Sequence, residues 1–350
     1  SIFIIVFWSF IYKEGYKLNF KRFQKIKIPF LYYGIIFFAS IFVLSSKDII
    51  LSSYFIFEWL TFLFIIYLYH NALDGLDINI AIKDIKNIIW LKIFTTLFVL
   101  IVAPELVLMG DSKTVYRIGG YFINPNHLGF LSSMLTLYYM FYNDRTKIHS
   151  IFMVIFLTIL IIATNSRGAL FSFILAFTYT LMYSKNIKNY LVMILLSFFM
   201  LTFFYFNIDY IYRGLDISNI ISLSERIPLW YNYYLEFIKS PIIGYGYIAG
   251  IKNMSLIISK AHWIAPHAHN DLIQAFLSGG IIVGFYTLFI YYLFFKSCFR
   301  QNQNNVNGIL LRGWFIQIIC ASILMPLISY KLSLLSSIVW IIIISSNRKG

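Results

Sequence analysis

Polar residue types that can do chemistry gather in a few short stretches of an otherwise apolar chain. The stretch APHAHNDLIQAFLSGG, residues 265–280, places His267 and His269 on either side of one alanine. Imidazole titrates near pH 6.5, so its neutral form can accept a proton from a hydroxyl at working pH. Asn270 and Asp271 follow the histidines directly, and one of them is expected to orient the imidazole ring of the base. The stretch therefore predicts a general base at the mouth of an apolar segment.

Zinc binding is the competing interpretation of the same stretch. His262 adds a third imidazole to the pair, which is enough for a catalytic zinc site with one open position. A His-x-His pair alone is nonetheless a weak metal signal, and no helical HExxH spacing accompanies it. We therefore expect a base and no metal.

Two arginines point to an anionic substrate. Arg167 lies in TNSRGAL, at the tip of a hairpin between two apolar segments, and Arg226 lies in SERIPLWYNYYLEFIKSPIIGYG. Guanidinium groups bind phosphate oxygens bidentately and stay charged at any working pH. Two of them can neutralise a pyrophosphate leaving group, as Mg²⁺ does in other enzymes. Together with a base, they predict group transfer from a lipid pyrophosphate to a hydroxyl at the membrane surface.

Other residues of these stretches leave two interpretations open. Arg117, in YRIGGYFINPNHLG, either contacts substrate or reaches to lipid headgroups. Gly244 and Gly246 form either an anion-binding nest or an ordinary turn. His127, two residues after a proline at a predicted helix start, is expected to be an interfacial side chain rather than a catalyst.

The elements that must position these residues are membrane helices. The chain has 350 residues, of which 60% are hydrophobic and 12% charged, and its mean hydropathy is +0.78. Soluble domains carry about 25% charged residues. The net charge of +14 is expected to reflect basic cytoplasmic loops rather than nucleic-acid binding. Cys298 and Cys320 offer neither a disulfide framework nor a CxxC site.

Apolar segments of spanning or near-spanning length predict an all-α, polytopic integral membrane protein with about 11–12 transmembrane helices. The opening SIFIIVFWSFIY is too short to span, so we expect the chain to begin inside a helix whose first half is missing. The other segments are 28–46, 51–70, 88–108, 126–142, 150–164, 168–183, 190–207, 270–295, 308–325 and 331–346.

Lysines and arginines predict the orientation of these helices. Placing residues 13–27 in the cytoplasm puts more than half of the 28 basic residues into short cytoplasmic loops. The chain then divides into an N-terminal transmembrane bundle at 1–207, a large external (periplasmic) loop at 208–269 and C-terminal transmembrane helices at 270–350. Lys92 and Arg312 are expected at cytoplasmic helix ends, and Cys298 is expected to react with impermeant reagents only from the cytoplasmic side.

The external loop is expected to contain an amphipathic helix. It would begin near Pro228, a residue suited to a first helical turn, and end at Ser240-Pro241. We expect it either in the outer membrane interface, which its aromatic residues favour, or packed against the bundle. The apolar residues that recur at helical spacing are Leu229, Trp230, Tyr233, Tyr234, Phe237 and Ile238.

These stretches resemble the O-antigen polymerase and O-antigen ligase superfamily of bacterial polysaccharide assembly. The resemblance rests on GGYFINPNHLG, NSRGAL, RIPLWYNYYLEFIKSPIIGYG and PHAHNDLIQAFLSGGIIVG, over roughly residues 115–290. It implies a metal-independent, inverting glycosyltransferase without a cofactor, in the bacterial inner (cytoplasmic) membrane, with its site facing the periplasm or cell exterior. The donor would be a glycan on undecaprenyl pyrophosphate. Membrane lipid, and the chain-length regulator and flippase of the same pathway, would be its partners.

The resemblance also assigns roles to residues. It places the base on His269 and the diphosphate contacts on Arg226 and Arg167. His267 becomes a supporting residue, and Arg117 a contact to the acceptor or to a headgroup. The remaining substrate-binding candidates are Asn270, Trp230, Gly244 and Gly246.

Three alternatives remain for the function. A polymerase, which joins lipid-linked repeat units into O-antigen or capsular polysaccharide, is favoured over a ligase, which moves the glycan to lipid A-core or protein. The loop 208–269 holds five basic and four acidic residues, which suits an oligosaccharide better than a phosphorylated core. A flippase predicts mid-membrane ionisable residues and repeat symmetry, for which Glu58 is the one acidic candidate. A non-catalytic export subunit would not need His269 and Arg226 together.

Overall fold

The computed structural model describes the parts of the chain that carry the four polar stretches, with gaps between them. The described residues are 50, 53–54, 56–58, 60–61, 78–109, 117–120, 122–141, 147–184, 226–246, 267–300, 305–327 and 333–346. The predicted segments 28–46 and 190–207, the opening segment and His262 lie outside these residues. The expected total of about 11–12 membrane helices therefore stays a prediction.

The described part of the chain confirms the all-α fold. Its strands are one antiparallel pair of two residues each, with Leu108 opposite Ile118. Helices α4, α13 and α14 are long and apolar enough to cross a membrane. The elements are α4 (Ile78–Val102), η2 (Pro104–Leu106), β1 (Leu108–Met109), β2 (Arg117–Ile118), α5 (Pro125–Phe141), α6 (Lys147–Ala163), α7 (Arg167–Ser184), α11 (Arg226–Lys239), α13 (Asp271–Arg300), α14 (Val306–Leu324) and α15 (Leu334–Ser346).

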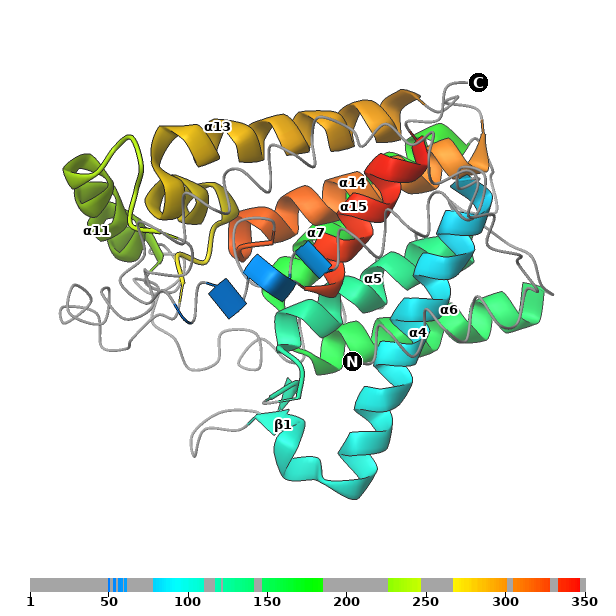
Figure 1. Cartoon of the computed structure of the whole chain (residues 1–350). Coiled ribbons are helices and arrows are strands. Elements are labelled where there is room, and N and C mark those ends of the chain that lie inside the picture. The colour runs from blue at the N-terminus through cyan, green and yellow to red at the C-terminus, as the bar shows by residue number, and fades with distance from the viewer. Residues whose placement is uncertain are drawn as a thin grey trace, which may run out of the picture.

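The core of the bundle forms around α5, α7 and α14, which pack against one another, with α6 against α5 and α13 against α14 (Figure 1). Close approach of α14 to α7 depends on Gly313, where a Cβ would lie 2.7 Å from the methyl carbon of Thr180. Trp314, fully buried, donates its indole N–H to the carbonyl oxygen of Met134 in α5 at 2.9 Å. Small residues and polar side chains thus join the helices, as expected where apolar surface alone gives no preference between neighbours and lipid.

Polar contacts sort the helix ends into two groups, as the predicted alternation requires. At one end Asn270, before α13, donates to Ile323 O, near the end of α14, at 3.4 Å. Toward the other ends of these two helices, Arg312, two turns into α14, donates to Phe299 O, next to the last residue of α13, at 3.3 Å. These two helices therefore run antiparallel, and which group of ends faces outside stays a prediction.

Two basic residues lie elsewhere than expected. Helix α4 begins ten residues before the predicted apolar run, because Ala81, Ile82 and Ile85 are buried at helical spacing. Lys92 consequently lies inside this helix, with its ammonium 4.1 Å from the ring centre of Phe122. Arg312 lies inside α14 and is buried; besides its hydrogen bond it stacks its guanidinium over the Phe299 ring at 4.8 Å.

Helix α13 is broken at two adjacent glycines. Gly279 (φ −138°, ψ 21°) and Gly280 (φ 62°, ψ −159°) leave the helical region and divide the element into residues 271–278 and 281–300. The second part has a length of about 30 Å at 1.5 Å per residue, which matches the hydrocarbon thickness of a bilayer. Exposed apolar side chains on α13 begin at Ile281. The break therefore divides α13 into a short part packed inside the protein and a longer part whose exposed apolar side chains suit a bilayer.

Single cysteines will test the orientation. Cys298 is fully buried, which makes it a poor reporter and corrects the expectation that it reacts from the cytoplasmic side. With Cys298 and Cys320 replaced by serine, exposed Ile242→Cys should react with an impermeant maleimide on intact spheroplasts. Exposed Arg300→Cys should react only in inverted vesicles. The reverse labelling pattern would overturn the orientation.

Candidate active site

The hairpin between α6 and α7 carries Arg167. It turns through Asn165, whose φ is 45°, a value that asparagine tolerates better than most residues. The hydroxyl of Ser166 then accepts the N–H of Ala169 at 3.3 Å, which caps the start of α7. Arg167 is the first residue of that helix. Its guanidinium therefore sits at the positive end of a helix dipole, where anions bind favourably.

Residues before and within the start of α5 hold this hairpin in place. Ser166 donates its hydroxyl to Asn126 Oδ1 at 2.9 Å, and Arg117 Nε donates to Thr164 O at 3.0 Å. Gly129 permits the close contact, since a Cβ there would lie 2.9 Å from the Thr164 hydroxyl oxygen. The structure thus places Arg117 as a support of the hairpin. A contact of Arg117 with acceptor or headgroup stays a prediction.

The segment 240–246 docks helix α11 onto the break in α13. Tyr245 N–H donates to Leu277 O at 3.0 Å and Gly246 N–H donates to Ser278 O at 2.8 Å. In the other direction, Ile281 N–H donates to Pro241 O at 2.8 Å. The backbone groups that the broken helix leaves open are thus satisfied by this segment.

Glycines on both sides make this docking possible. Gly244 has φ 65°, and a Cβ there would lie 2.5 Å from Leu277 O. Gly280 has φ 62°, and its Cβ would lie 2.1 Å from Ile242 O. The N–H groups of Gly244 and Gly246 donate within the protein, so their contacts support the turn interpretation. Contact of these two glycines with substrate stays a prediction.

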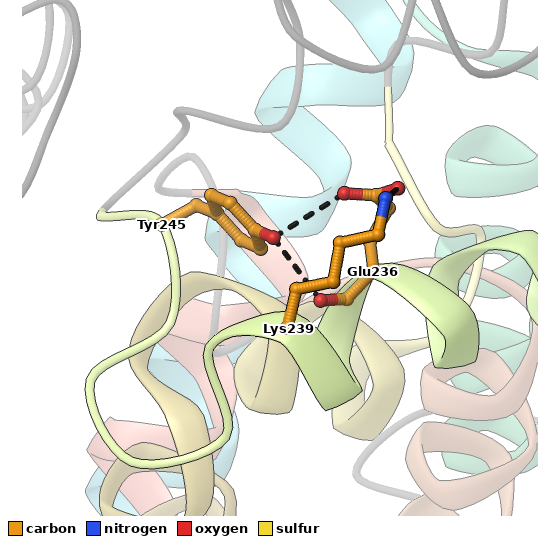
Figure 2. A network of polar contacts seen from close by, with 3 residues as sticks. All are labelled: Glu236, Lys239 and Tyr245. Atoms are coloured by element: carbon orange, nitrogen blue, oxygen red, sulfur yellow. Dashed lines mark hydrogen bonds and ion pairs between the residues drawn. The ribbon is translucent and has the colours of Figure 1, made fainter.

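Tyr245 also closes the segment onto the end of α11. Its hydroxyl donates to the carbonyl oxygen of Glu236 at 3.1 Å and to the carboxylate Oε2 at 3.3 Å, while Lys239 pairs with the same carboxylate (Figure 2). Partial burial, and then the charge of Glu236, raise the pKa of Tyr245, so its hydroxyl remains a donor. The contact satisfies a carbonyl group in the last turn of α11.

The His-x-His segment is held at Ala268 by two helices. Trp230 in α11 donates its indole N–H to Ala268 O at 2.8 Å. Gln274 in α13 accepts the Ala268 N–H at 3.0 Å and donates to Ser278 Oγ, also at 3.0 Å. Both Ala268 and Gln274 are buried. Trp230, predicted as a substrate-binding residue, therefore has its N–H committed to positioning the histidines.

His269 has a strained backbone that its neighbours impose. Its φ is 51°, in the left-handed region that residues other than glycine rarely adopt. Its N–H donates to His267 Nδ1 at 3.1 Å, and the ring centroids of the two histidines lie 4.1 Å apart. Since Nδ1 of His267 accepts this bond, the neutral His267 ring carries its proton on Nε2. His267 thus supports His269 directly.

Asn270 caps one helix and joins it to another; that it or Asp271 orients the His269 ring stays a prediction. Asn270 Oδ1 accepts the N–H of Ile273 at 3.0 Å and caps the start of α13. Its amide nitrogen donates to Ile323 O. The side chain therefore joins α13 to α14, and substrate binding by Asn270 stays a prediction.

Asp271 is an anchor for the same helix. It is fully buried and accepts the hydroxyl of Tyr291 at 2.6 Å and the N–H of Leu327 at 2.7 Å. These contacts join the carboxylate to α13 itself and to the chain after α14, while His267 accepts the N–H of His269. Sequence could not reveal this, because both partners of Asp271 are distant along the chain.

Electrostatic interactions join Arg167, Arg226 and His269 into one site. Burial, and then the charge of Arg167, lower the pKa of Arg226, and burial lowers the pKa of Arg167. Burial, and then the charge of Arg226, lower the pKa of His269 to about 4. The fold thus brings together a neutral imidazole and two guanidinium groups from three separate segments.

Comparison with known protein families gives a match in the middle of the chain. Residues 152–290 match the O-antigen ligase family. The chain contains an O-antigen ligase family domain. The family comprises ligases and polymerases that transfer lipid-linked glycans, and its members are proteins of the bacterial inner membrane. No curated protein matches the chain. The matched range includes Arg167, Arg226 and His269, whereas Arg117 precedes it.

Several positioning residues of the O-antigen ligase domain were not predicted. Ser166 directly before a helix is an N-cap signature that the sequence does contain. Gln274 lies in an apolar run, where a buried amide needs partners that sequence does not identify. Over the described ranges, no three His, Cys, Asp or Glu side chains group as metal ligands would. His262, the third candidate ligand, lies outside those ranges.

Removing the Trp230 N–H should impair the O-antigen ligase domain without unfolding it. Trp230→Phe keeps an aromatic ring but loses the bond to Ala268, so His269 is no longer held in register. We expect kcat to fall roughly 10- to 100-fold, as a misplaced catalytic group does, with donor KM changed by less than about threefold. Trp90→Phe is the matched control, because it loses an equivalent indole bond, to Tyr139 at 2.8 Å. Equal losses in both variants would contradict the positioning role.

The pH dependence should reflect the lowered pKa of His269. Because Arg226 and burial disfavour the imidazolium, the neutral base persists below the usual pH range of histidine. The acid limb of kcat/KM, which reports the free enzyme, should therefore lie near pH 4 rather than 6.5. A bound diphosphate adds negative charge and should raise the pKa, so the acid limb of kcat should lie higher. If the acid limbs of kcat/KM and of kcat both lay near pH 6.5, the result would contradict the effect of Arg226 on His269.

Proposed function

We propose that this protein polymerises undecaprenyl-pyrophosphate-linked oligosaccharide repeat units at the outer face of the inner membrane, yielding O-antigen or capsular polysaccharide. The observation that carries the proposal is that α11, docked on the broken α13 and bonded through Trp230 to Ala268, brings Arg226 beside His269, whose pKa it lowers, as Arg167 lowers that of Arg226. It combines a proton acceptor with two fixed positive charges. A reaction that moves a glycan from a diphosphate to a hydroxyl requires these groups.

The reaction can be written on these three residues. His269 takes the proton of an acceptor sugar hydroxyl, whose oxygen attacks the anomeric carbon of the donor glycan. The bond from that carbon to the diphosphate oxygen breaks on the opposite face, so the configuration inverts. Arg226 and Arg167 stabilise the negative charge that grows on the leaving diphosphate. Each stands in the first position of a helix, whose dipole adds to the stabilisation.

Substitutions in the three residues test the chemistry. His269→Ala should lower the transfer rate 10²- to 10⁴-fold, the usual loss for a general base, with normal membrane insertion. Arg226→Lys and Arg167→Lys keep the charge but lose the planar fork, and both should be severely impaired. The assay uses purified protein with a defined lipid-linked oligosaccharide, with and without EDTA. Activity that EDTA removes and zinc restores would replace this mechanism with a metal-dependent one.

A ligase is the second candidate, because the matching family carries that description. The charge of the loop 208–269 supports a polymerase, since five basic against four acidic residues provide little for a phosphorylated lipid A-core. A strain lacking the protein should accordingly accumulate single repeat units, either lipid-linked or attached to the surface acceptor. A null strain that holds long lipid-linked polymer with nothing on the acceptor would identify a ligase.

A further inference from the structure

Helix α11 has a second apolar face that no part of the described protein covers. Its buried face, with Leu229 and Tyr233, packs on α13. At 100° per residue, five exposed apolar side chains fall within a sector of about 100° on another side of the helix. We call them the outer face of α11: Ile227 (49% exposed), Tyr231 (62%), Tyr234 (56%), Leu235 (42%) and Ile238 (52%).

This outer face continues onto the membrane surface of the bundle. Pro241, just after α11, is hydrogen-bonded to Ile281, where the spanning part of α13 begins. Ile242 and Ile281 are both exposed, and Phe285 follows one turn later on α13. Exposed apolar side chains therefore continue from α13 through Ile242 onto α11, which lies beside the start of α13 (Figure 1).

The polar residues of α11 lie on a different sector. Asn232, Glu236 and Lys239 occupy roughly 220° to 280° on the same helical wheel, away from the outer face. The apolar part of a ligand that is charged at one end would therefore contact the outer face and not the polar sector. Arg226, at the start of the helix, directly precedes Ile227.

We infer that the outer face of α11 binds the proximal part of the polyprenyl tail of the lipid-linked donor. The inference rests on the proposed function, which holds the donor diphosphate at Arg226 and Arg167. The tail is covalently attached to that diphosphate, so it leaves the site beside Arg226. From Ile227 to Ile238 the face runs about 17 Å at 1.5 Å per residue, and it ends where α13 enters the bilayer. Tyr231 and Tyr234 suit the polar-to-apolar boundary.

Donor analogues with tails of different length test this inference. One carries the full polyprenyl chain and the other a short, water-soluble prenyl group, on the same diphosphate oligosaccharide. The variants Leu235→Ser and Ile238→Ser change exposed side chains and so leave the core intact. Each should raise KM for the long-tail donor about 5- to 10-fold, from the loss of buried apolar area. Neither should change KM for the short-tail donor, and kcat should stay within about twofold.

Ile155→Ser provides the matched control. Ile155 lies on α6 and is 51% exposed, which is nearly equal to Ile238, but α6 is not the helix that carries Arg226. The Ile155→Ser variant should leave KM unchanged for both the long-tail and the short-tail donor. Equal effects of Ile155→Ser and Ile238→Ser, or equal effects on both donors, would mean that the outer face contacts bulk lipid only. A wild-type protein that transfers glycan from neither donor would instead refute the proposed function.

Discussion

The break in α13 at Gly279-Gly280 is the constraint on which the candidate site depends. A continuous helix would satisfy its own backbone groups and leave nothing for segment 240–246 to pair with. Because the helix is interrupted, Leu277 O, Ser278 O and Ile281 N–H become available, and the segment after α11 docks on them. That docking places α11 beside the His-x-His segment, so that Trp230 reaches Ala268. Arg226 therefore lies near His269 because α13 is interrupted.

The same break separates two tasks along one element. Residues 281–300 are long enough to cross the hydrocarbon region, whereas residues 271–278 carry Asp271 and Gln274 as anchors. A diphosphate and a sugar hydroxyl are water-soluble groups, and the lipid carrier is not. A site formed by the first residues of α7 and α11 and by the short segment before α13 can meet both requirements if it lies at the membrane surface.

Sequence predicted the membrane helices well because an apolar run of about 20 residues is rarely stable outside a bilayer. It failed where a helix continues past its apolar run, as in α4, whose early turns bury Ile82 and Ile85 but also carry Lys83. For the candidate site, residue types indicated the base and the arginines. The helix signals predicted the C-terminal end of α11 at its last residue, Lys239. The partners of Asp271 and Trp230 were beyond reach, because a hydrogen bond between distant segments leaves no local pattern. For Gly244 the sequence left a turn and an anion-binding nest open, and its contacts in the structure support the turn.

The charges of the site favour the reaction over the resting state. The charge of Arg167 lowers the pKa of Arg226, so the two guanidinium groups repel, and in the proposed reaction the donor diphosphate would relieve that repulsion. The negative charge on the leaving oxygen grows as the glycosidic bond breaks, so the attraction is larger in the transition state than in the bound donor. The same diphosphate offsets the effect of Arg226 on His269, which makes the imidazole a stronger base when a donor is present. In the proposed reaction, base strength and leaving-group stabilisation would therefore rise together, so that a bound donor favours proton removal from the acceptor.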